Sequence, residues 1–542
     1  MTKFNRKSIN KHRYHVNATR NFEGGLAFKF SNPKTELINL VATNLIEDKY
    51  YEASSENIQK LYQCIKKCAQ IDPEFVLQVA GYARTELYLR SIPIFLTVVA
   101  ANLPETKPFV RKYTKDVIQR ADEVTETIAC QLQNFGKPIP NCIKKALSDA
   151  LDQFDEYQFN KYFNKSRSGN EKISLKTVLR LIHKKPINEK QETLLGYYVR
   201  DRNDLNNELI KQHLPLTYNR EQLLRCETFN EEAKKFAERS HATWETLIAK
   251  FGSTKETWES VISNMGYMAR LRNLRNFIKN DINIDPILNY LTNPKNIEKS
   301  KQLPFRFLSA YKMLEREYIK DPFVKNKVLS AINTMLELSV RNIPKLNGKN
   351  FFASDNSGSM LVPPVSPRSI IMPIDVSCLM TAMAIHFCEE VVTSAFGTRF
   401  KRIYCNKTAP IMQNYERIRN ADVGWATNGY LIVKYLLDKK IDVDRIFVFT
   451  DMELYDIDAR NDNKEKTFSH YFQKYKRRIN PDVYLYFFNL ANYGHLVVPE
   501  NEPKTIVIGG WSDGIFKFIK YFEQDRNSQV HYIQSNLWRS AD

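Results

Sequence analysis

The feature that most constrains the fold is a change of pattern near residue 345. Before it, apolar residues recur three and four positions apart, as in Phe75, Val79 and Ala83 after Asp72-Pro73, which predicts helices. After "NIPKLNGKN", short apolar runs such as "DRIFVFTD", "DVYLYFFNL" and "KTIVIGGW" alternate with helix-like stretches such as "CLMTAMAIHFCEEVV" and "GYLIVKYLLDKK". Because strands that alternate with helices form mainly parallel sheets, this part predicts an α/β domain.

The two patterns divide the chain, whose 542 residues are too many for one core. We expect a basic N-terminal tail over 1–20, a helical domain over 21–345 and a doubly wound α/β domain over 346–542. Helices that continue for more than 300 residues with short breaks favour stacked pairs of the HEAT-repeat kind. The expected fold class is therefore a multidomain α plus α/β protein.

The positive charge is confined to one part of the chain. Residues 1–350 hold 57 Lys and Arg against 39 Asp and Glu, whereas residues 351–542 hold 23 against 22. A field of one sign over one segment favours a polyanionic partner, with nucleic acids and anionic membrane surfaces as the candidates. A solvated surface kept soluble by its charge is the other interpretation.

Several classes of protein are disfavoured. The longest apolar run, "IPIFLTVVAANL", has 12 residues, and a membrane-spanning helix needs about 20. The polar, basic N-terminus is not typical of a secretory signal, and the scattered cysteines favour a reducing compartment, so we expect a cytoplasmic protein, or also a nuclear one in a eukaryote. Cys64 and Cys68 lack a matching Cys or His pair, which favours buried packing over zinc.

An oxygen-rich loop follows the first predicted strand of the α/β domain. In "DNSGS", Asp355, Ser357 and Ser359 are spaced two apart, and Thr427 in "GWATNGY" and Asp451 at the end of "FVFTD" follow in order. Ligands bind at the carboxyl ends of strands in such sheets, and hydroxyl and carboxylate oxygens suit Mg²⁺. Helix capping by the same residues is the alternative.

This order of residues resembles the metal-ion-dependent adhesion site of von Willebrand factor A domains. The resemblance implies that Ser357, Ser359 and Thr427 coordinate Mg²⁺ or another divalent cation directly, that Asp355 and Asp451 act largely through waters, and that an open position accepts a partner's carboxylate. We see no catalytic arrangement and expect a protein that is not an enzyme.

The helical part carries a second resemblance. "GKPIPNCIKKALSDALDQFDEYQFNKYF" (136–163), followed by "SLKTVLRLIHKKP" (174–186), resembles the TROVE module, named for telomerase, Ro and vault proteins. With an A domain behind it, the chain is similar to the Ro ribonucleoprotein autoantigen family. That family implies a HEAT-like helical ring, small noncoding Y RNAs on its outer face and single-stranded 3′ ends of defective RNAs in its hole. "LPFRFLSAY" and "DPEFVLQVAGYAR" are closer to telomerase- and vault-associated members.

The candidate RNA contacts are mainly cations. The segment after "FDEYQ" is dense in Lys and Arg against one acid, Glu171, and such density favours salt-dependent phosphate binding. On a helix starting near Ser174, Lys176, Arg180 and His183 would share one face. The Ro resemblance implies contacts at Lys161, at Arg167 or Lys165, and at His183. The full candidate set is Lys161, Lys165, Arg167, Lys172, Lys176, Arg180, His183, Arg272 and Arg275.

Two side-chain groups have alternative interpretations. Arg272 and Arg275 in "MARLRNLRNFIK" fit RNA contact, and they fit helix packing as well. We expect Trp244 and Trp258 to be buried core residues and not platforms on which bases stack.

Together these features predict an RNA-binding ribonucleoprotein component that holds small Y-like RNA and misfolded or 3′-extended RNA in quality control. The A domain would recruit an acidic protein partner or an exoribonuclease. The alternatives are a telomerase- or vault-associated subunit and a metal-dependent protein-binding scaffold; a nuclease is disfavoured because the helical part lacks a base or metal cluster.

Overall fold

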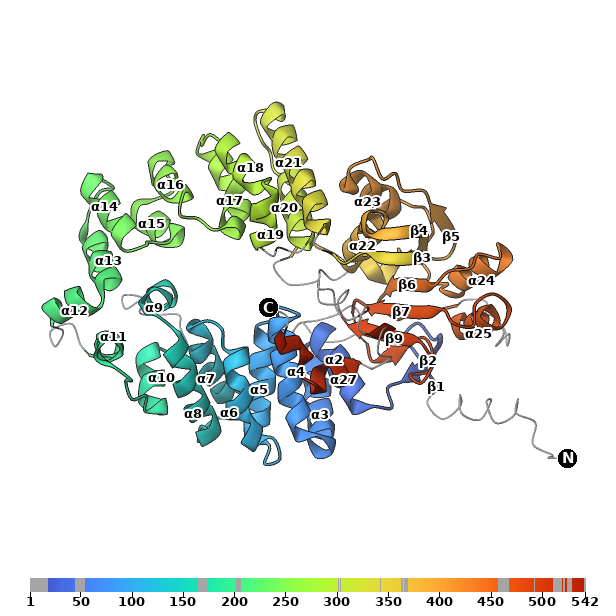
Figure 1. Cartoon of the computed structure of the whole chain (residues 1–542), viewed down its shortest axis with the longest axis horizontal. Helices are drawn as coiled ribbons and strands as arrows, with labels where there is room; N and C mark the ends of the chain where they lie inside the picture. Colours follow the sequence, from blue (N-terminus) through green and yellow to red (C-terminus); the bar gives the residue numbers. More distant parts are fainter. Residues whose placement is uncertain are drawn as a thin grey trace. The chain divides into compact units, whose positions relative to one another are not determined.

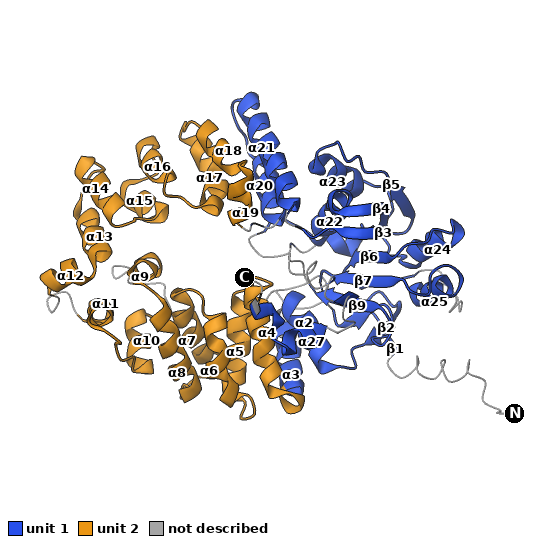
Figure 2. Cartoon of the chain, in the orientation of Figure 1, with its two compact units in different colours: residues 1–68, 301–542 blue, residues 69–300 orange. Residues whose placement is uncertain are grey.

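The computed structural model describes residues 18–43, 54–163, 173–200, 206–361, 364, 369–456, 467–509, 519, 522–523 and 529–540, apart from 301, 303, 342 and 492. The chain forms two compact units, residues 69–300 and residues 1–68 with 301–542 (Figure 2). Among the described residues, no helix has both the length and the hydropathy to cross a membrane. Candidate residues Lys165, Arg167 and Lys172 lie outside the described ranges.

The unit of residues 69–300 is built from helices (Figure 1). Helix α4 packs on α5 and α6, α6 packs on α8, and α5 packs on α7, so alternate helices stack in two layers. This stacking confirms the predicted helix pairs. The bounds are α4 Pro73–Thr85, α5 Ser91–Asn102, α6 Lys107–Val117, α7 Asp122–Asn134, α8 Asn141–Ala150, η1 Leu151–Gln153, α9 Glu156–Tyr162, α10 Leu175–Ile182, α11 Glu189–Val199, α12 Asn207–His213, α13 Pro215–Arg225, α14 Glu231–Arg239, α15 Trp244–Phe251, α16 Lys255–Ile262, α17 Tyr267–Lys279, α18 Asp285–Leu291 and α19 Pro294–Ser300.

Local sequence signals set the starts of these helices. Asp72 accepts a hydrogen bond from the Phe75 backbone N–H (3.3 Å), with Pro73 at the first helical position of α4. Asp155 does the same for α9, and Ser174 for α10. Each cap satisfies an amide that has no partner inside the helix, and α4 and α10 begin where the sequence predicts.

The other unit contains the α/β domain. Its six-stranded sheet has the order β5-β4-β3-β6-β7-β9, and only β5 runs antiparallel to its neighbour. The strands are β3 Leu346–Asp355, β4 Cys388–Phe396, β5 Phe400–Ile403, β6 Arg445–Thr450, β7 Tyr484–Asn489 and β9 Thr505–Gly509. The helices of this unit are α2 Pro33–Thr43, α3 Ser54–Ile71, α20 Pro304–Arg316, α21 Pro322–Val340, η3 Gly358–Leu361, α22 Pro373–Phe387, α23 Ile411–Arg419, α24 Tyr430–Asp438, α25 Phe468–Arg478, α27 Gln529–Gln534 and η5 Leu537–Ser540.

Alternation along the central strands fills a core on each face of the sheet. Phe351 and Ala353 of β3 join one buried cluster with residues of α24 and α25. Phe352, between them, turns to the other face and meets Phe387 of α22 and Phe447 of β6. The sheet is therefore covered by helices on both sides, as the α/β pattern predicts.

One helix prediction was wrong at its C-terminal end. "CLMTAMAIHFCEEVV" reads as one helix, but α22 ends at Phe387 and β4 begins at Cys388. The β-branched residues Val391 and Val392 pair in parallel with β3 instead. Tertiary pairing outweighs the local helical pattern at this point.

The segment before α2 also departs from the expected helices. Strands β1 (Ala18–Arg20) and β2 (Leu26–Lys29) form an antiparallel sheet with β8 (His495–Leu496). Asn21 donates a side-chain hydrogen bond to the Leu454 carbonyl (2.7 Å). A Cβ at Gly25 would lie 2.0 Å from the same oxygen, so only glycine permits this approach.

The two cysteines weighed as metal ligands are packed residues. Cys64 and Cys68 are buried, and both thiols donate to the Pro33 carbonyl, at 3.4 and 3.0 Å. The packing interpretation is confirmed.

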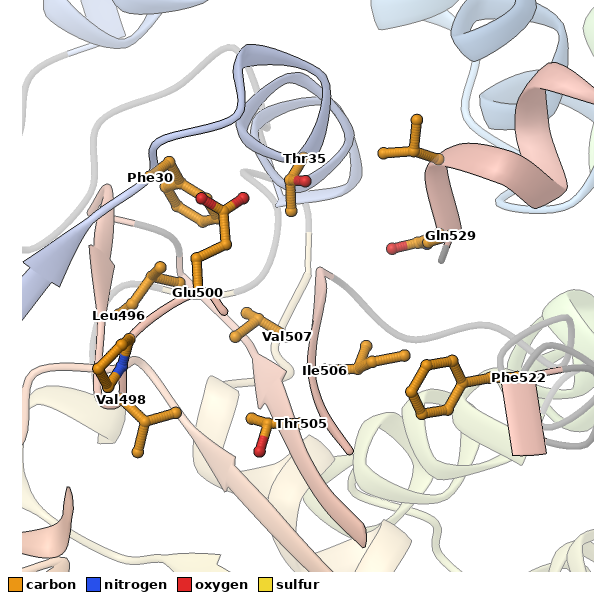
Figure 3. A pocket seen from close by; sticks show the side chains of 12 residues that line it. Phe30, Thr35, Leu496, Val498, Glu500, Thr505, Ile506, Val507, Phe522 and Gln529 are labelled. Carbon is orange, nitrogen blue, oxygen red and sulfur yellow. The ribbon is translucent and has the colours of Figure 1, made fainter. Parts of the chain in front are cut away.

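A cavity of about 150 Å³ lies between β9, the segment before α2, and α27 (Figure 3). Its lining is mostly apolar, with Val507, Ile506 and Phe522 among the residues that face it. Glu500 lines it too, but its Oε2 accepts hydrogen bonds from the Ser31 and Asn32 amides (2.6 and 3.1 Å) and so serves the start of α2. The cavity is a feature of packing around the sheet edge.

Candidate functional site

The first part of the candidate site is the loop at the end of β3. Asp355 and Ser357 are fully buried, and Ser359 is half-buried. The Ser357 amide donates to Asp355 Oδ1 (2.9 Å), and the Oγ atoms of Ser357 and Ser359 lie 3.4 Å apart. The loop therefore folds back on the carboxylate and places the two hydroxyls side by side.

Two further loops meet this one. Because β3 and β6 are parallel neighbours, Thr450 at the end of β6 donates its hydroxyl to Asp355 Oδ2 (2.6 Å), directly before Asp451. The Gly358 amide donates to the Trp425 carbonyl (2.9 Å), and the Tyr455 amide donates to the Thr427 carbonyl (2.8 Å). The structure thus brings together all five residues that the sequence pattern singled out, Asp355, Ser357, Ser359, Thr427 and Asp451.

Burial sets the electrostatics of the pair of carboxylates. It raises the pKa of Asp355 to about 6, against hydrogen bonds from Ser357 and Thr450 that lower it. Burial and the nearby Asp355 charge together raise the pKa of Asp451 to about 8, against hydrogen bonds from Ser359 and the Glu453 amide that lower it. Asp451 Oδ1 accepts from the Glu453 amide (3.0 Å), but Oδ2 is buried without a hydrogen-bond partner. A buried carboxylate oxygen without a hydrogen-bond partner is unfavourable, and a bound proton or cation would stabilise it.

The residues fit a hard divalent cation. Two residues with carboxylates and three with hydroxyls lie on three loops that meet here, and such oxygens suit Mg²⁺. The described residues contain no group of three or more His, Cys, Asp and Glu that could hold a metal, so any ion here would depend on the hydroxyls. The capping alternative does not fit Thr427, because α24 begins after Gly429 and has no side-chain cap.

The second part of the candidate site is the cationic surface of α9 and α10, in the other unit. Lys161 is exposed in the last turn of α9, with its ammonium 5.7 and 5.4 Å from the ring centres of Tyr157 and Tyr162. On α10, Arg180 is exposed and Lys176 is half-buried. These cations and aromatic rings lie near one another in sequence, as in many nucleic-acid surfaces.

His183 does not continue the helical face that was predicted. Helix α10 ends at Ile182, and His183 is its C-cap in the left-handed conformation (φ 53°), with an exposed side chain. The prediction that His183 lies at the seventh position of one helical face is therefore wrong. Lys184 is not a free cation either, because its ammonium bonds Asp152 (2.5 Å) and its side chain is 4% exposed.

The arginines of α17 differ in their exposure to solvent. Arg272 and Arg275 are exposed, whereas Arg270 is buried and donates to the Met265 and Ser263 carbonyls (2.8 and 2.9 Å). Trp258 is 1% exposed and stacks on Trp244 with ring centres 5.6 Å apart. The core interpretation is confirmed for Trp258, whereas Trp244 is half-buried.

The fold and these two surfaces define a class of protein: a stacked-helix protein with a von Willebrand factor A domain. Family models match accordingly, the TROVE domain over residues 29–238 and 229–346 and the Ro60 vWA domain over 349–523. The chain belongs to the TROVE family, whose members bind RNA in ribonucleoproteins.

Similar proteins include a telomerase-associated protein and a Ro protein, the two kinds of relative that the sequence resembles. Telomerase protein component 1 is 26% identical over 361 residues in Rattus norvegicus and 26% over 380 in Mus musculus, covering 54% and 58% of this chain but only 13% and 14% of those proteins. The crystal structure of the Deinococcus radiodurans RO (RSR) protein superposes with a TM-score of 0.66 at 14% identity, covering 90% of this chain and 98% of that one. At that identity the structural match shows the shared fold.

Proposed function

We propose that this chain binds small structured noncoding RNA of the Y-RNA kind, together with single-stranded 3′ ends of misfolded RNA, and acts in RNA quality control without catalysing a reaction. The observation that carries the proposal is the cationic surface of α9 and α10, formed by the exposed Lys161 and Arg180 and the half-buried Lys176, in a part of the chain with 57 Lys and Arg against 39 Asp and Glu. Phosphate contacts of this kind position an RNA by its backbone and shape.

A telomerase- or vault-associated role is the second candidate. It is supported by the relatives named telomerase protein component 1. Both candidate functions would use the same cationic surface. They differ in the RNA that is bound.

The first experiment compares three fluorescent hairpins of one sequence: RNA, RNA with a single-stranded 3′ tail, and DNA. We expect the tailed RNA to bind most tightly and the DNA hairpin least, because an A-form RNA helix and its 2′-hydroxyls differ from B-form DNA. Equal affinity for all three would show nonspecific charge attraction and contradict the proposal.

We also propose that Asp355, Ser357, Ser359, Thr427 and Asp451 hold Mg²⁺, for structure and for recognition. When bound, the ion would supply positive charge for the two buried carboxylates and an open coordination position for a partner's oxygen. The unpartnered Asp451 Oδ2 supports this proposal.

The raised pKa values predict how Mg²⁺ stabilisation depends on pH. The folded, metal-free site holds protons to higher pH than an unfolded chain does, so raising the pH from below 6 to above 8 ionises the buried carboxylates and destabilises that state. Mg²⁺ competes with those protons, so its stabilising effect should grow with pH, towards about 2.7 kcal/mol at about 100 times Kd.

Thermal unfolding with and without Mg²⁺ measures this effect. Asp355→Asn should abolish the Mg²⁺ shift, while Asp422→Asn, at an exposed carboxylate of the same domain, should retain it. The measurement is made at one pH below 6 and at one above 8. A Mg²⁺-induced shift of the unfolding midpoint that is equal at the two pH values, or that persists in Asp355→Asn, would contradict the proposed ion site.

A further inference from the structure

One tryptophan lies exposed beside the candidate metal centre. Trp425 is 75% exposed, whereas Trp258 and Trp538 are 1% and 2% exposed and Trp244 is half-buried. An indole left in water forgoes the burial that normally stabilises a fold. Its position, two residues before Thr427, places that apolar surface on one of the three loops that meet at the site.

Hydrogen bonds tie the backbone on which the indole stands. The Trp425 carbonyl accepts from the Gly358 amide (2.9 Å), and the Ala426 amide donates to Thr398 Oγ1 (3.0 Å). A Cβ built on Gly358 would lie 3.3 Å from the indole Cε3, so the ring rests against the glycine between Ser357 and Ser359. The backbone that carries the ring is therefore tied to its neighbours before any partner arrives, which lowers the entropic cost of ordering this loop on binding.

The surroundings favour a protein partner over a nucleic acid. The segment that contains this loop carries 23 Lys and Arg against 22 Asp and Glu. Arg399, whose amide donates to the Val423 carbonyl beside the loop (2.7 Å), is already paired with Asp422 (2.6 Å). A polyanion needs an excess of cations, which this segment lacks, whereas a single carboxylate needs only the ion.

We propose that Trp425 anchors a protein partner that gives one carboxylate to the metal and lays a neighbouring large apolar or aromatic side chain on the indole. This inference rests on the proposed Mg²⁺ site. The Trp425 carbonyl and the Ala426 amide are bonded within the domain, so what this residue offers a partner is its indole, with an apolar stacking face and one N–H donor. Tryptophan in such a position is typical of interface hot spots.

Short peptides test the pairing of the two contacts. The probes are acetyl-Gly-Asp-Phe-Gly-amide, acetyl-Gly-Asp-Gly-Gly-amide and acetyl-Gly-Asn-Phe-Gly-amide, titrated in Mg²⁺ against the full chain and followed by ligand-observed NMR. We expect the Asp-Phe peptide to bind at least about tenfold more tightly than either other peptide, an advantage of the size that one hot-spot aromatic contact gives.

Trp425→Ala should remove the tenfold advantage of the Asp-Phe peptide and leave the Asp-Gly peptide and the Mg²⁺-induced thermal shift unchanged. Tyr404→Ala, at another exposed aromatic residue of the domain (68% exposed), is the matched control and should retain the advantage.

Equal binding of the peptides, no peptide binding at all, or an oligonucleotide that binds only when Trp425 is present would overturn the inference. Each of these outcomes leaves the ion site standing if Mg²⁺ still shifts unfolding. If Mg²⁺ does not shift the unfolding of the unmodified chain, both proposals are overturned.

Discussion

Replacing Asp375 by Asn is expected to destabilise the unit of residues 1–68 and 301–542 by about 3 to 5 kcal/mol, the cost of removing one partner from a buried ion pair. Asp375 Oδ1 is buried and accepts hydrogen bonds from Lys312 Nζ (2.6 Å), Tyr415 Oη (2.6 Å) and Arg419 Nε (2.9 Å). Burial alone would raise the pKa of Asp375, but the hydrogen bonds, with Lys312 foremost, outweigh it and lower the pKa. The amide would leave a buried ammonium without its anion.

The position of this cluster makes the effect large. Lys312 lies on α20, Asp375 on α22, and Tyr415 and Arg419 on α23, so one carboxylate joins the last helices of the TROVE match to the A domain. The Lys312 and Asp375 side chains are 9% and 0% exposed. Water therefore cannot replace the lost partner.

Thermal unfolding should show this loss as a fall in the midpoint of roughly 5 to 8 °C for a unit of this size. Asp422→Asn is the matched control, because it makes the same change in an ion pair whose side chains are 62% and 83% exposed. That control should cost less than about 1 kcal/mol. Similar midpoints for the two variants would mean that the Asp375 cluster does not hold the unit together.

Reversing two charges on the α9 and α10 surface is expected to weaken RNA binding by about one to two orders of magnitude near 0.1 M salt. In Lys161→Glu/Arg180→Glu, two phosphate contacts become repulsive, so the slope of log K against log salt should also become shallower by about 2. Fluorescence anisotropy at several salt concentrations, with the tailed RNA hairpin, measures both quantities.

A matched variant separates this surface from net charge. Lys401→Glu/Lys439→Glu changes the charge by the same amount, and Lys439, like Lys161, stands at the end of a helix. It should keep the affinity and the salt slope of the unmodified protein. An equal loss in both variants would mean that overall charge, and not the α9 and α10 surface, holds the RNA.

Much of the fold was readable from local signals. The Asp72-Pro73 start, the helix expected near Ser174 and three-to-four periodicity predicted helices, and strand–helix alternation predicted the parallel sheet. The five oxygen-bearing residues could be found because Asp355, Ser357, Ser359 and Asp451 stand at strand ends and Thr427 stands in a short pattern before a helix. Parallel strands then bring their carboxyl ends to one edge.

The rest depended on contacts between distant residues. Thr450 bonds Asp355 across 95 positions, and Lys312 bonds Asp375 across 63, and no local pattern marks either pair. The strand at Cys388 reads as helix because its pairing with β3 is decided by tertiary structure. His183 follows a sound helical period, yet the helix ends one residue earlier in a left-handed cap.

The central claim is that the α9 and α10 surface binds a specific structured RNA. The direct measurement is to purify the full chain from its native cells after crosslinking and to sequence the bound RNA, for the unmodified protein, Lys161→Glu/Arg180→Glu and Lys401→Glu/Lys439→Glu. We predict one small structured RNA, enriched with the unmodified protein and the second variant and lost with the first. Recovery of no specific RNA, or the same RNA from all three proteins, would contradict the claim.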